Sequence, residues 1–213
     1  MNRTPLAQLQ ALLGRTPVIP VLTIERAADA VPLATALLAG GLRVLEVTLR
    51  TEAALEALAE IATRVPEAVV GMGSVIEEAQ FAAATRRGAR FVVSPGATEG
   101  LEAAAAAAGV PWIPGVQSVS EALELRSRAY RFLKLFPAAA AGGVEFLRAI
   151  AGPLPDVWFC PTGGVSAANA RDYLELANVA CVGGSWLAPP ELIVRQDWNR
   201  IRELAREARA LRP

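Results

Sequence analysis

The stretch VLEVTLRTEAALEALAEIATRVPEAVVGMG, residues 44–73, places an apolar run, an amphipathic stretch and a second apolar run in succession. Both apolar runs are short, rich in β-branched residues and bounded by Gly, Pro or polar side chains, which is typical of buried strands. The middle part, residues 52–64, has the apolar spacing of a helix. The stretch therefore predicts a strand, a helix and a second strand, which is the pattern of a parallel βαβ unit.

The same unit recurs along the chain, with strand starts 20 to 26 residues apart. The predicted strands are residues 18–24, 44–49, 68–73, 91–94, 112–116, 132–136, 157–162 and 180–184. The helical stretches between and after them are residues 26–39, 52–64, 76–87, 98–107, 119–128, 143–150, 166–176 and 191–209. Eight such units favour a closed barrel over an open doubly wound sheet. We therefore expect an α/β fold, a single (β/α)8 TIM barrel over residues 1–213, with an extra N-terminal helix at residues 4–13 capping its bottom.

The composition excludes several kinds of partner. The 213 residues include 21 basic and 21 acidic side chains, so the formal net charge is zero. Without a long block of one sign, nothing attracts a nucleic-acid backbone or an anionic membrane, and we expect neither partner. No apolar run reaches the ~18 to 20 residues of a membrane span, and the N-terminus has no signal-peptide pattern, so we expect a cytoplasmic protein. Cys160 and Cys181 lack CxxC spacing and are expected to be buried thiols.

Two further features of the composition narrow the chemistry. The chain has no histidine, which excludes most metal hydrolases and most Ser-His or Cys-His designs. Of the 21 basic residues, 20 are arginine, and Lys134 is the single lysine. Arginine does not release its proton to attack a carbonyl, whereas a desolvated lysine can. The single lysine indicates either a position that needs an amine or drift in an arginine-rich proteome.

The strand predicted at residues 44–49 directs polar side chains to one face. Period-2 alternation places Glu46, Thr48 and Arg50 together, opposite an apolar face that would pack on helices. The polar face would then point into the barrel, where unpaired charges are costly. A Glu–Arg pair can serve packing alone. Arg50, however, follows the strand's end, where barrel sites gather, and is placed to meet a ligand anion.

Lys134 stands in the middle of the apolar run FLKLFP, residues 132–137. If Lys134 points inward, it shares the interior of the barrel with Glu46. Burial disfavours the ammonium form of a lysine, which is how an amine becomes nucleophilic near neutral pH. The run therefore predicts a nucleophilic amine close to a carboxylate. A neutralising buried ion pair is the alternative interpretation.

Glycine pairs end the last two predicted strands, in PTGGVS (residues 161–166) and VGGSW (residues 182–186). Such glycines expose backbone N–H groups, and a helix N-terminus beyond them would add a positive dipole. A single Gly-Gly is usually a tight turn, but two at matching strand ends indicate a phosphate cradle, and many barrels bind phosphate after strands 7 and 8. Small residues in GMGS (residues 71–74) and SPG (residues 94–96) leave room for a substrate, and Ser74 offers a hydroxyl.

Taken together, these motifs resemble one enzyme family. The motifs are EVTLR (46–50), GMGS (71–74), SPG (94–96), PGV (114–116), KLFPA (134–138), PTGGV (161–165) and GGSW (183–186). Their order and spacing resemble the 2-keto-3-deoxy-6-phosphogluconate (KDPG) aldolases, which also act as 4-hydroxy-2-oxoglutarate (KHG) aldolases. The resemblance covers about residues 17–192. It implies a carbon–carbon lyase, a class I aldolase that needs neither metal nor cofactor and that assembles as a homotrimer.

The resemblance also implies roles for individual residues. Lys134 would form the Schiff base, and Glu46 would act as general acid and base. Arg50 and Ser74 would hold the substrate carboxylate; the family usually has Thr where this chain has Ser74, which keeps the hydroxyl and loses the methyl. The other implied substrate-binding residues are Pro95, Thr162, Gly163, Gly164, Gly184 and Ser185, of which the three glycines and Ser185 would form the phosphate site.

The expected reaction cleaves KDPG to pyruvate and glyceraldehyde 3-phosphate, the end of an Entner–Doudoroff route. It could extend to 4-hydroxy-2-oxoglutarate, which yields pyruvate and glyoxylate. Another alternative is the galactonate epimer of KDPG, since Thr162 at a strand end could hydrogen-bond the C4 hydroxyl that distinguishes the two.

Three rival functions remain open. A metal-dependent aldolase would need His or clustered carboxylates. A phosphosugar isomerase or epimerase on the same barrel would use Glu46 and leave Lys134 idle. A non-catalytic phosphate-binding scaffold would not need a buried group made of Glu, Lys and Arg.

Overall fold

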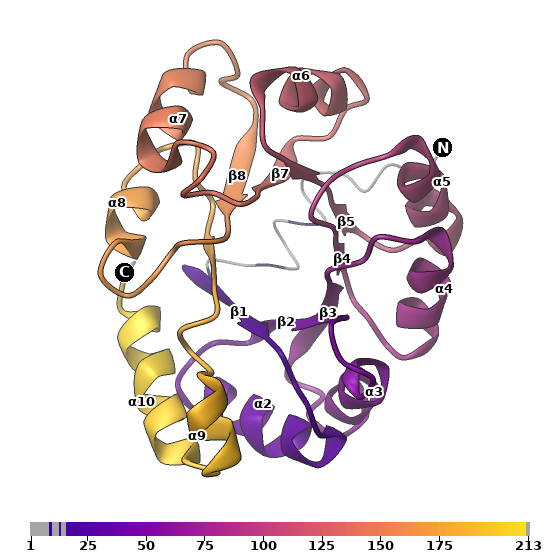
Figure 1. Ribbon diagram of the computed structural model, residues 1–213, viewed down its shortest axis with the longest axis vertical. Coiled ribbons are helices and arrows are strands. Elements are labelled where there is room, and N and C mark those ends of the chain that lie inside the picture. The colour runs from indigo at the N-terminus through magenta and orange to yellow at the C-terminus, as the bar shows by residue number, and fades with distance from the viewer. Residues whose placement is uncertain (1–8, 10–12, 14–15, 212–213) are drawn as a thin grey trace.

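The computed structural model describes residues 9, 13 and 16–211, which form an α/β fold (Figure 1). The strands are β1 (Val18–Leu22), β2 (Val44–Thr48), β3 (Val69–Gly73), β4 (Val92–Val93), β5 (Trp112–Ile113), β6 (Gly115–Val116), β7 (Phe132–Leu135), β8 (Trp158–Pro161) and β9 (Val182–Gly184). The helices are η1 (Ala27–Asp29), α2 (Ala30–Ala39), α3 (Ala54–Arg64), α4 (Glu78–Arg86), α5 (Glu99–Ala108), α6 (Val119–Ser127), α7 (Gly143–Ile150), α8 (Ala170–Leu174), α9 (Pro190–Val194) and α10 (Trp198–Arg209). Strands surround the centre of the molecule and helices lie outside them (Figure 1).

The strands pair in parallel and form two curled sheets. The larger sheet has the order β5-β4-β3-β2-β1-β9, and the smaller has the order β6-β7-β8. Two isolated parallel bridges, Phe159↔Val179 and Thr162↔Gly183, join β8 to the segment around β9. Because all pairs are parallel, the carboxyl ends of the strands lie on the same side of the molecule.

The strand predicted at residues 112–116 is two strands in the structure. Pro114 separates β5 from β6, and a proline has no N–H to donate to a strand ladder. On one side of Pro114, β5 pairs with β4; on the other side, β6 pairs with β7. The Lys134 N–H donates to the Pro114 carbonyl at 2.9 Å, so the chain passes from one sheet to the other at this proline.

The single helix predicted at residues 191–209 is also divided. Gln196 has a φ of 54°, a left-handed conformation that a helix cannot contain, and it separates α9 from α10. The Asp197 carboxylate then accepts a hydrogen bond from the Arg200 N–H and caps α10. The apolar period continues across this break, which is why the sequence pattern does not reveal it.

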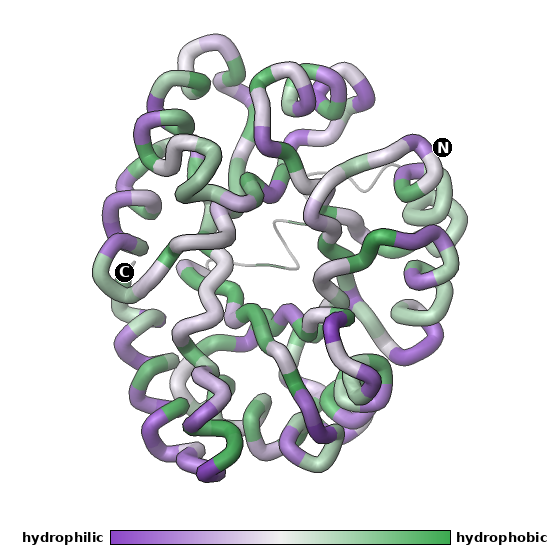
Figure 2. The backbone as a smooth tube through the Cα atoms, viewed as in Figure 1, coloured by the Kyte–Doolittle hydropathy of each residue, from purple (hydrophilic) through white to green (hydrophobic). Residues whose placement is uncertain are grey.

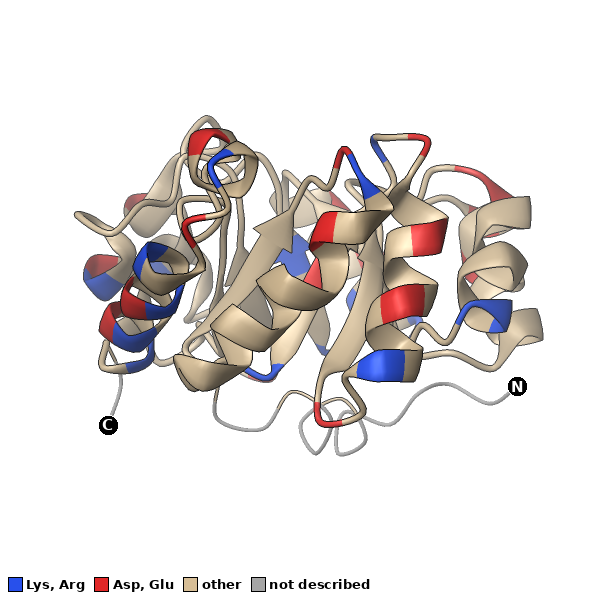
Figure 3. Ribbon diagram, turned by 90° about the horizontal axis from the view of Figure 1, so that it is seen from below, with Lys and Arg blue, Asp and Glu red and all other residues tan. Residues whose placement is uncertain are grey.

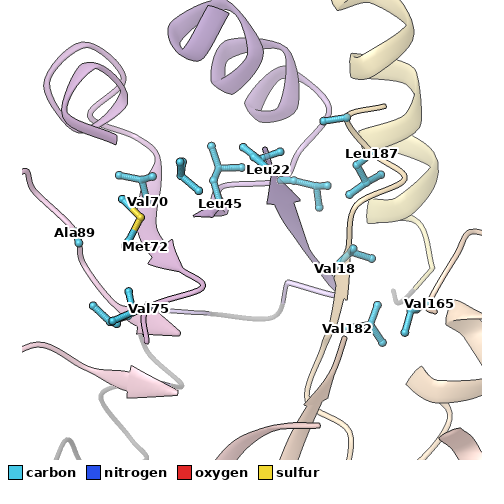
Figure 4. Close-up of a cluster of buried hydrophobic side chains, with 14 of the residues drawn as sticks. Val18, Leu22, Leu45, Val70, Met72, Val75, Ala89, Val165, Val182 and Leu187 are labelled. Carbon is cyan, nitrogen blue, oxygen red and sulfur yellow. The ribbon is translucent and has the colours of Figure 1, made fainter. Parts of the chain in front are cut away.

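The hydrophobic core has two parts. The larger part lies between the sheets and the helices, where Leu22, Leu45 and Val70 are fully buried (Figure 4). The smaller part is a second cluster of buried residues, to which six of the strands contribute; its members are Leu9, Leu13, Ile19, Val44, Phe91, Val93, Ile113, Phe132, Cys160 and Cys181. Both cysteines are buried thiols, as predicted. Hydrophilic residues recur along the outer helices (Figure 2), and most charged residues lie there or in loops (Figure 3).

The predicted N-terminal helix at residues 4–13 lies mostly outside the described residues. Leu9 and Leu13, which are described, are 4% and 5% exposed and pack in the interior cluster. Of the helices described, none is long and apolar enough to cross a membrane.

Candidate active site

Lys134 and Glu46 meet in the space between the two curled sheets. Lys134 lies on β7 and Glu46 on β2, and these strands belong to different sheets (Figure 1). The two residues are 88 positions apart in sequence. The Lys134 Nζ lies 3.2 Å from the Glu46 Oε1, and both side chains are 4% exposed. The ring of Phe136 covers the amine, with its centroid 5.2 Å from Nζ. Strand alternation thus brings a buried amine and a buried carboxylate within proton-transfer distance.

Glycines on β3 make room for the Glu46 side chain. Glu46 lies beside Gly71 in the strand register, and Thr48 lies beside Gly73. A Cβ atom at Gly73 would overlap the Glu46 carboxylate, and a Cβ atom at Gly71 would overlap the ring of Phe91. Small residues at these positions were expected to leave space for a substrate. Part of that space is occupied by the Glu46 carboxylate.

Replacing Gly73 by alanine is therefore expected to lower kcat for the cleavage that the sequence predicts by about 100-fold, because a displacement of about 1 Å in a reacting group has an effect of this size. The added methyl would push Glu46 away from Lys134. The measurement is pyruvate release at saturating substrate. Gly152→Ala is the matched control, since Gly152 is exposed, lies outside the candidate site, and a Cβ atom there meets no atom within 4 Å. Equal activity of both variants would contradict this reason for a glycine at position 73.

Arg50 and Ser74 contact each other at the carboxyl ends of β2 and β3. The Arg50 Nε donates to the Ser74 Oγ at 3.0 Å, and Ser74 has a φ of 60°. In the described part of the chain, Arg50 has no carboxylate partner. The guanidinium is exposed, so its remaining N–H groups are available to an anionic ligand.

A cavity of about 100 Å³ opens beside Arg50 at this end of the strands. Its lining residues are Val21, Arg50, Phe136, Thr162, Gly163, Gly164, Val165, Gly183 and Ser185. The cavity joins the guanidinium to the loops that follow β8 and β9. The structure therefore brings together Arg50, Thr162, Gly163, Gly164 and Ser185, five of the residues predicted for substrate binding.

Backbone N–H groups at this cavity lack protein acceptors. Gly163 and Gly164 have φ values of 95° and 79°, which favour glycine. Within the residues described, neither the Gly164 N–H nor the Ser185 N–H donates to an acceptor. The Asn169 side chain holds the loop by donating to the Gly164 carbonyl at 3.0 Å. Such free amides are suited to bind phosphate oxygens.

The structure differs from the predicted phosphate cradle in two respects. The helix predicted at residues 166–176 is only α8 (Ala170–Leu174), so loop amides, not a helix N-terminus, face the cavity. Of the predicted glycine pair at the end of β9, Gly183 lines the cavity and Gly184 does not; the ring of Trp186 lies beside Gly184. A Cβ atom at Gly183 would overlap the Thr162 hydroxyl, so this glycine admits Thr162 to the site.

Pro95 does not line the cavity beside Arg50. It lies in the loop after β4, and its carbonyl packs so closely on Gly115 that a Cβ atom there would overlap it. Gly115 is the register partner of Lys134, so Gly115 on β6 lies between Pro95 and the strand that carries Lys134. The Ser94 hydroxyl holds this loop by donating to the Gly96 carbonyl.

A second cavity, of about 170 Å³, lies between α5 and α6 and has a different chemistry. Its charged lining residues are Glu99, Glu102, Glu121, Glu124 and Arg128. Hydrogen bonds from Glu102 and Glu124 raise the pKa of the Arg128 guanidinium above its ordinary value. The net charge of this lining is negative, which does not suit an anionic substrate.

Comparison with known proteins agrees with the geometry of the site. The chain matches the family described as KDPG and KHG aldolase over residues 9–204. The KHG/KDPG aldolase of Escherichia coli strain K12 is 51% identical over 199 residues, which cover 93% of each chain. The 2-dehydro-3-deoxy-phosphogluconate aldolase of Pseudoalteromonas atlantica is also 51% identical over 199 residues, again 93% of each chain.

Solved structures show the same likeness. A KDPG aldolase from Legionella pneumophila, with pyruvate captured as a covalent carbinolamine intermediate, is 49% identical with a TM-score of 0.91, over 93% of this chain and 97% of that one. A structure named KDPGal is only 23% identical, with a TM-score of 0.80 over 92% of this chain and 93% of that one, and shows likeness of fold alone. From the match over most of its length and from these identities, the chain belongs to the KDPG and KHG aldolase family.

Proposed function

We propose that this protein is a class I aldolase that cleaves KDPG to pyruvate and glyceraldehyde 3-phosphate, and also cleaves 4-hydroxy-2-oxoglutarate to pyruvate and glyoxylate. The observation that carries the proposal is the buried pair of Lys134 and Glu46, 3.2 Å apart. The carbinolamine captured in the Legionella pneumophila relative supports the same chemistry at Lys134. The names of the relatives at 51% identity favour the gluconate substrate over its galactonate epimer.

Lys134 supplies the nucleophile. Glu46, whose carboxylate lies 3.2 Å from Nζ, takes a proton from the Lys134 ammonium, and the amine so freed adds to the C2 ketone of the substrate and forms a carbinolamine. Glu46 passes the two protons that leave the nitrogen, one after the other, to the former carbonyl oxygen, which departs as water and leaves an iminium cation. The iminium then accepts the electron pair of the C3–C4 bond.

Glu46 also moves the proton that starts the cleavage. Its carboxylate removes the C4 hydroxyl proton, the C3–C4 bond breaks, and the aldehyde leaves. The electron pair of that bond forms the enamine of pyruvate on Lys134. Protonation at C3 and hydrolysis of the imine release pyruvate and restore the amine.

Arg50 and the loop amides position the two ends of the substrate. The Arg50 guanidinium, with Ser74 on its Nε, binds the C1 carboxylate and fixes C2 over Lys134. The amides of Gly164 and Ser185 bind the phosphate on C6. Binding energy from this remote phosphate then holds the reacting bond in place.

Replacing Ser185 by alanine keeps the amide and removes the hydroxyl, to which we also assign a hydrogen bond to the phosphate; the change is expected to raise KM for KDPG about tenfold, because a hydrogen bond to a charged group contributes about 1.5 kcal/mol. KM for 4-hydroxy-2-oxoglutarate, which carries no phosphate, should change far less. Steady-state kinetics with both substrates makes the comparison within one variant. An equal rise in both KM values would show that the Ser185 hydroxyl does not bind the phosphate.

The experiment that tests the proposed function is reduction of a pyruvate imine. The protein is incubated with pyruvate and borohydride, its intact mass is measured, and the modified peptide is mapped. Because the chain contains a single lysine, a stable adduct on Lys134 that requires pyruvate would establish the imine. A folded protein that forms no adduct would support a phosphosugar isomerase or epimerase that uses Glu46 without Lys134.

The fold that we propose is a closed barrel that forms a single domain over residues 1–213. In this barrel, β5 and β6 count as one strand interrupted at Pro114, which gives eight strands. The two bridges between β8 and the segment around β9 close the barrel. The N-terminal helix at residues 4–13 would cap its bottom, with Leu9 and Leu13 as the buried contacts. Resemblance to the family supports a homotrimer in the cytoplasm.

A further inference from the structure

A pair of threonine hydroxyls lies at the rim of the candidate active site. The Thr23 Oγ1, just after β1, is 3.2 Å from the Thr48 Oγ1 at the end of β2. Thr48 is fully buried, whereas Thr23 is half-buried and so remains accessible from the strand ends. Neither hydroxyl takes part in the proton transfers at Lys134 and Glu46 or in the binding of the carboxylate and the phosphate.

The direction of the hydrogen bond within this pair follows from a count of donors. The Thr48 hydroxyl has one proton and donates it to the Leu22 carbonyl at 2.9 Å. Thr23 must therefore be the donor in the bond between the two hydroxyls. Since the Thr23 proton is used in this way, the Thr23 Oγ1 can offer only lone pairs to a third group. Among the residues described, it has no further partner. Thr23 is thus an oriented acceptor.

The strand register places this acceptor next to the reacting groups. Val21 pairs with Glu46, and Val21 also lines the cavity beside Arg50. Thr23 follows Val21 by two residues, and their contacts place both on the inner face, about 7 Å apart along the strand at the usual rise. On one side β1 pairs with β2, which carries Glu46, and on the other side it pairs with β9, which leads to Ser185. Thr23 therefore follows the strand that lies between the reacting groups and the loop amides.

We propose that Thr23 is a specificity-determining residue, whose Oγ1 accepts a hydrogen bond from a hydroxyl on the aldehyde side of the substrate. The inference rests on the function proposed above. The C4 hydroxyl gives its proton to Glu46, and the C6 phosphate binds at the loop amides. The C5 hydroxyl, between them, is left without a partner, and the acceptor on Thr23 has the complementary chemistry.

This role predicts discrimination between aldehydes that differ by one hydroxyl. A site built to hydrogen-bond a hydroxyl disfavours an analogue that lacks it, because the polar group of the site is then left unpaired. Glyceraldehyde 3-phosphate carries the hydroxyl that becomes C5, and 3-oxopropyl phosphate lacks only that group. The wild-type protein should condense pyruvate with the first aldehyde more efficiently than with the second.

The test compares the two aldehydes in the wild type, Thr23→Val and Thr23→Ser. Valine matches threonine in shape without the hydroxyl, and serine keeps the hydroxyl. In Thr23→Val, the ratio of kcat/KM for glyceraldehyde 3-phosphate to kcat/KM for 3-oxopropyl phosphate should fall about tenfold, the usual effect of one lost hydrogen bond. In Thr23→Ser, the ratio should remain close to that of the wild type.

Two outcomes would overturn the role of Thr23. An unchanged ratio in Thr23→Val would show that the hydroxyl does not bind the substrate, and an equal loss for both aldehydes would show that it only supports the strand ends. Borohydride reduction with pyruvate, run on the same proteins, separates this failure from failure of the proposed function. A Lys134 adduct together with an unchanged ratio rejects Thr23 alone, whereas absence of the adduct in the wild type rejects the aldolase itself and Thr23 with it.

Discussion

Replacing Lys134 by methionine is expected to lower aldolase kcat by at least about 10⁴-fold, the size of effect seen when a covalent nucleophile is removed. Methionine has nearly the length of lysine and lacks the amine, so the variant can form no imine at position 134. No other lysine in the chain can replace it, because Lys134 is the only one. Pyruvate release coupled to lactate dehydrogenase measures the loss.

The matched control for this variant is Lys134→Arg, which keeps the positive charge beside Glu46. If the role of Lys134 is covalent, the arginine variant should be as inactive as the methionine variant and should form no adduct with pyruvate and borohydride. If Lys134 were only a charge partner, Lys134→Arg would retain activity while Lys134→Met lost it. Substantial turnover by either variant would contradict the imine mechanism.

The sequence pattern was sufficient to predict the central pair of the site. Alternation along β2 and β7 placed Glu46 and Lys134 on inward faces, and the eight repeats made those faces part of one interior. The prediction succeeded because a period of two leaves only two faces for each strand, and an apolar outer face determines which one is inward. The 3.2 Å contact between Lys134 and Glu46 then forms because the fold brings β2 and β7, which are far apart in sequence, to face each other.

Other features depended on relations between strands that the pattern does not contain. The need for glycine at position 73 comes from the register of β2 on β3, and the direction of the Thr23 hydroxyl comes from the buried Leu22 carbonyl, which accepts the Thr48 proton. The break at Pro114 could have been found, since a proline in a central strand argues against one continuous ladder.

Replacing Glu46 by glutamine is expected to lower kcat about 10³-fold, which is within the usual range for a general acid or base. Glutamine keeps the shape of the side chain but cannot take the proton from the C4 hydroxyl. Adduct formation with pyruvate should be slower but still occur at Lys134, because the nucleophile remains. Rates of KDPG cleavage and of borohydride trapping, measured on the same protein, separate the two steps. Equal turnover of the variant and the wild type would exclude Glu46 as the proton carrier.

The same substitution also tests whether the pair is coupled in the folded protein. Removing one partner of a buried ion pair leaves the other charge unpaired and costs about 3 to 5 kcal/mol of stability. Urea unfolding should therefore show a loss of this order in Glu46→Gln and in Lys134→Met, whose wild-type side chains are each 4% exposed.

The double variant Lys134→Met/Glu46→Gln leaves no unpaired charge, so it should be more stable than the sum of the two losses predicts. Strict additivity would show that the two charges do not interact. If the two charges interact but the protein forms no adduct with pyruvate and borohydride, Lys134 and Glu46 are a structural ion pair. If the pair is catalytic, the double variant should show the interaction and the wild type should form the adduct on Lys134.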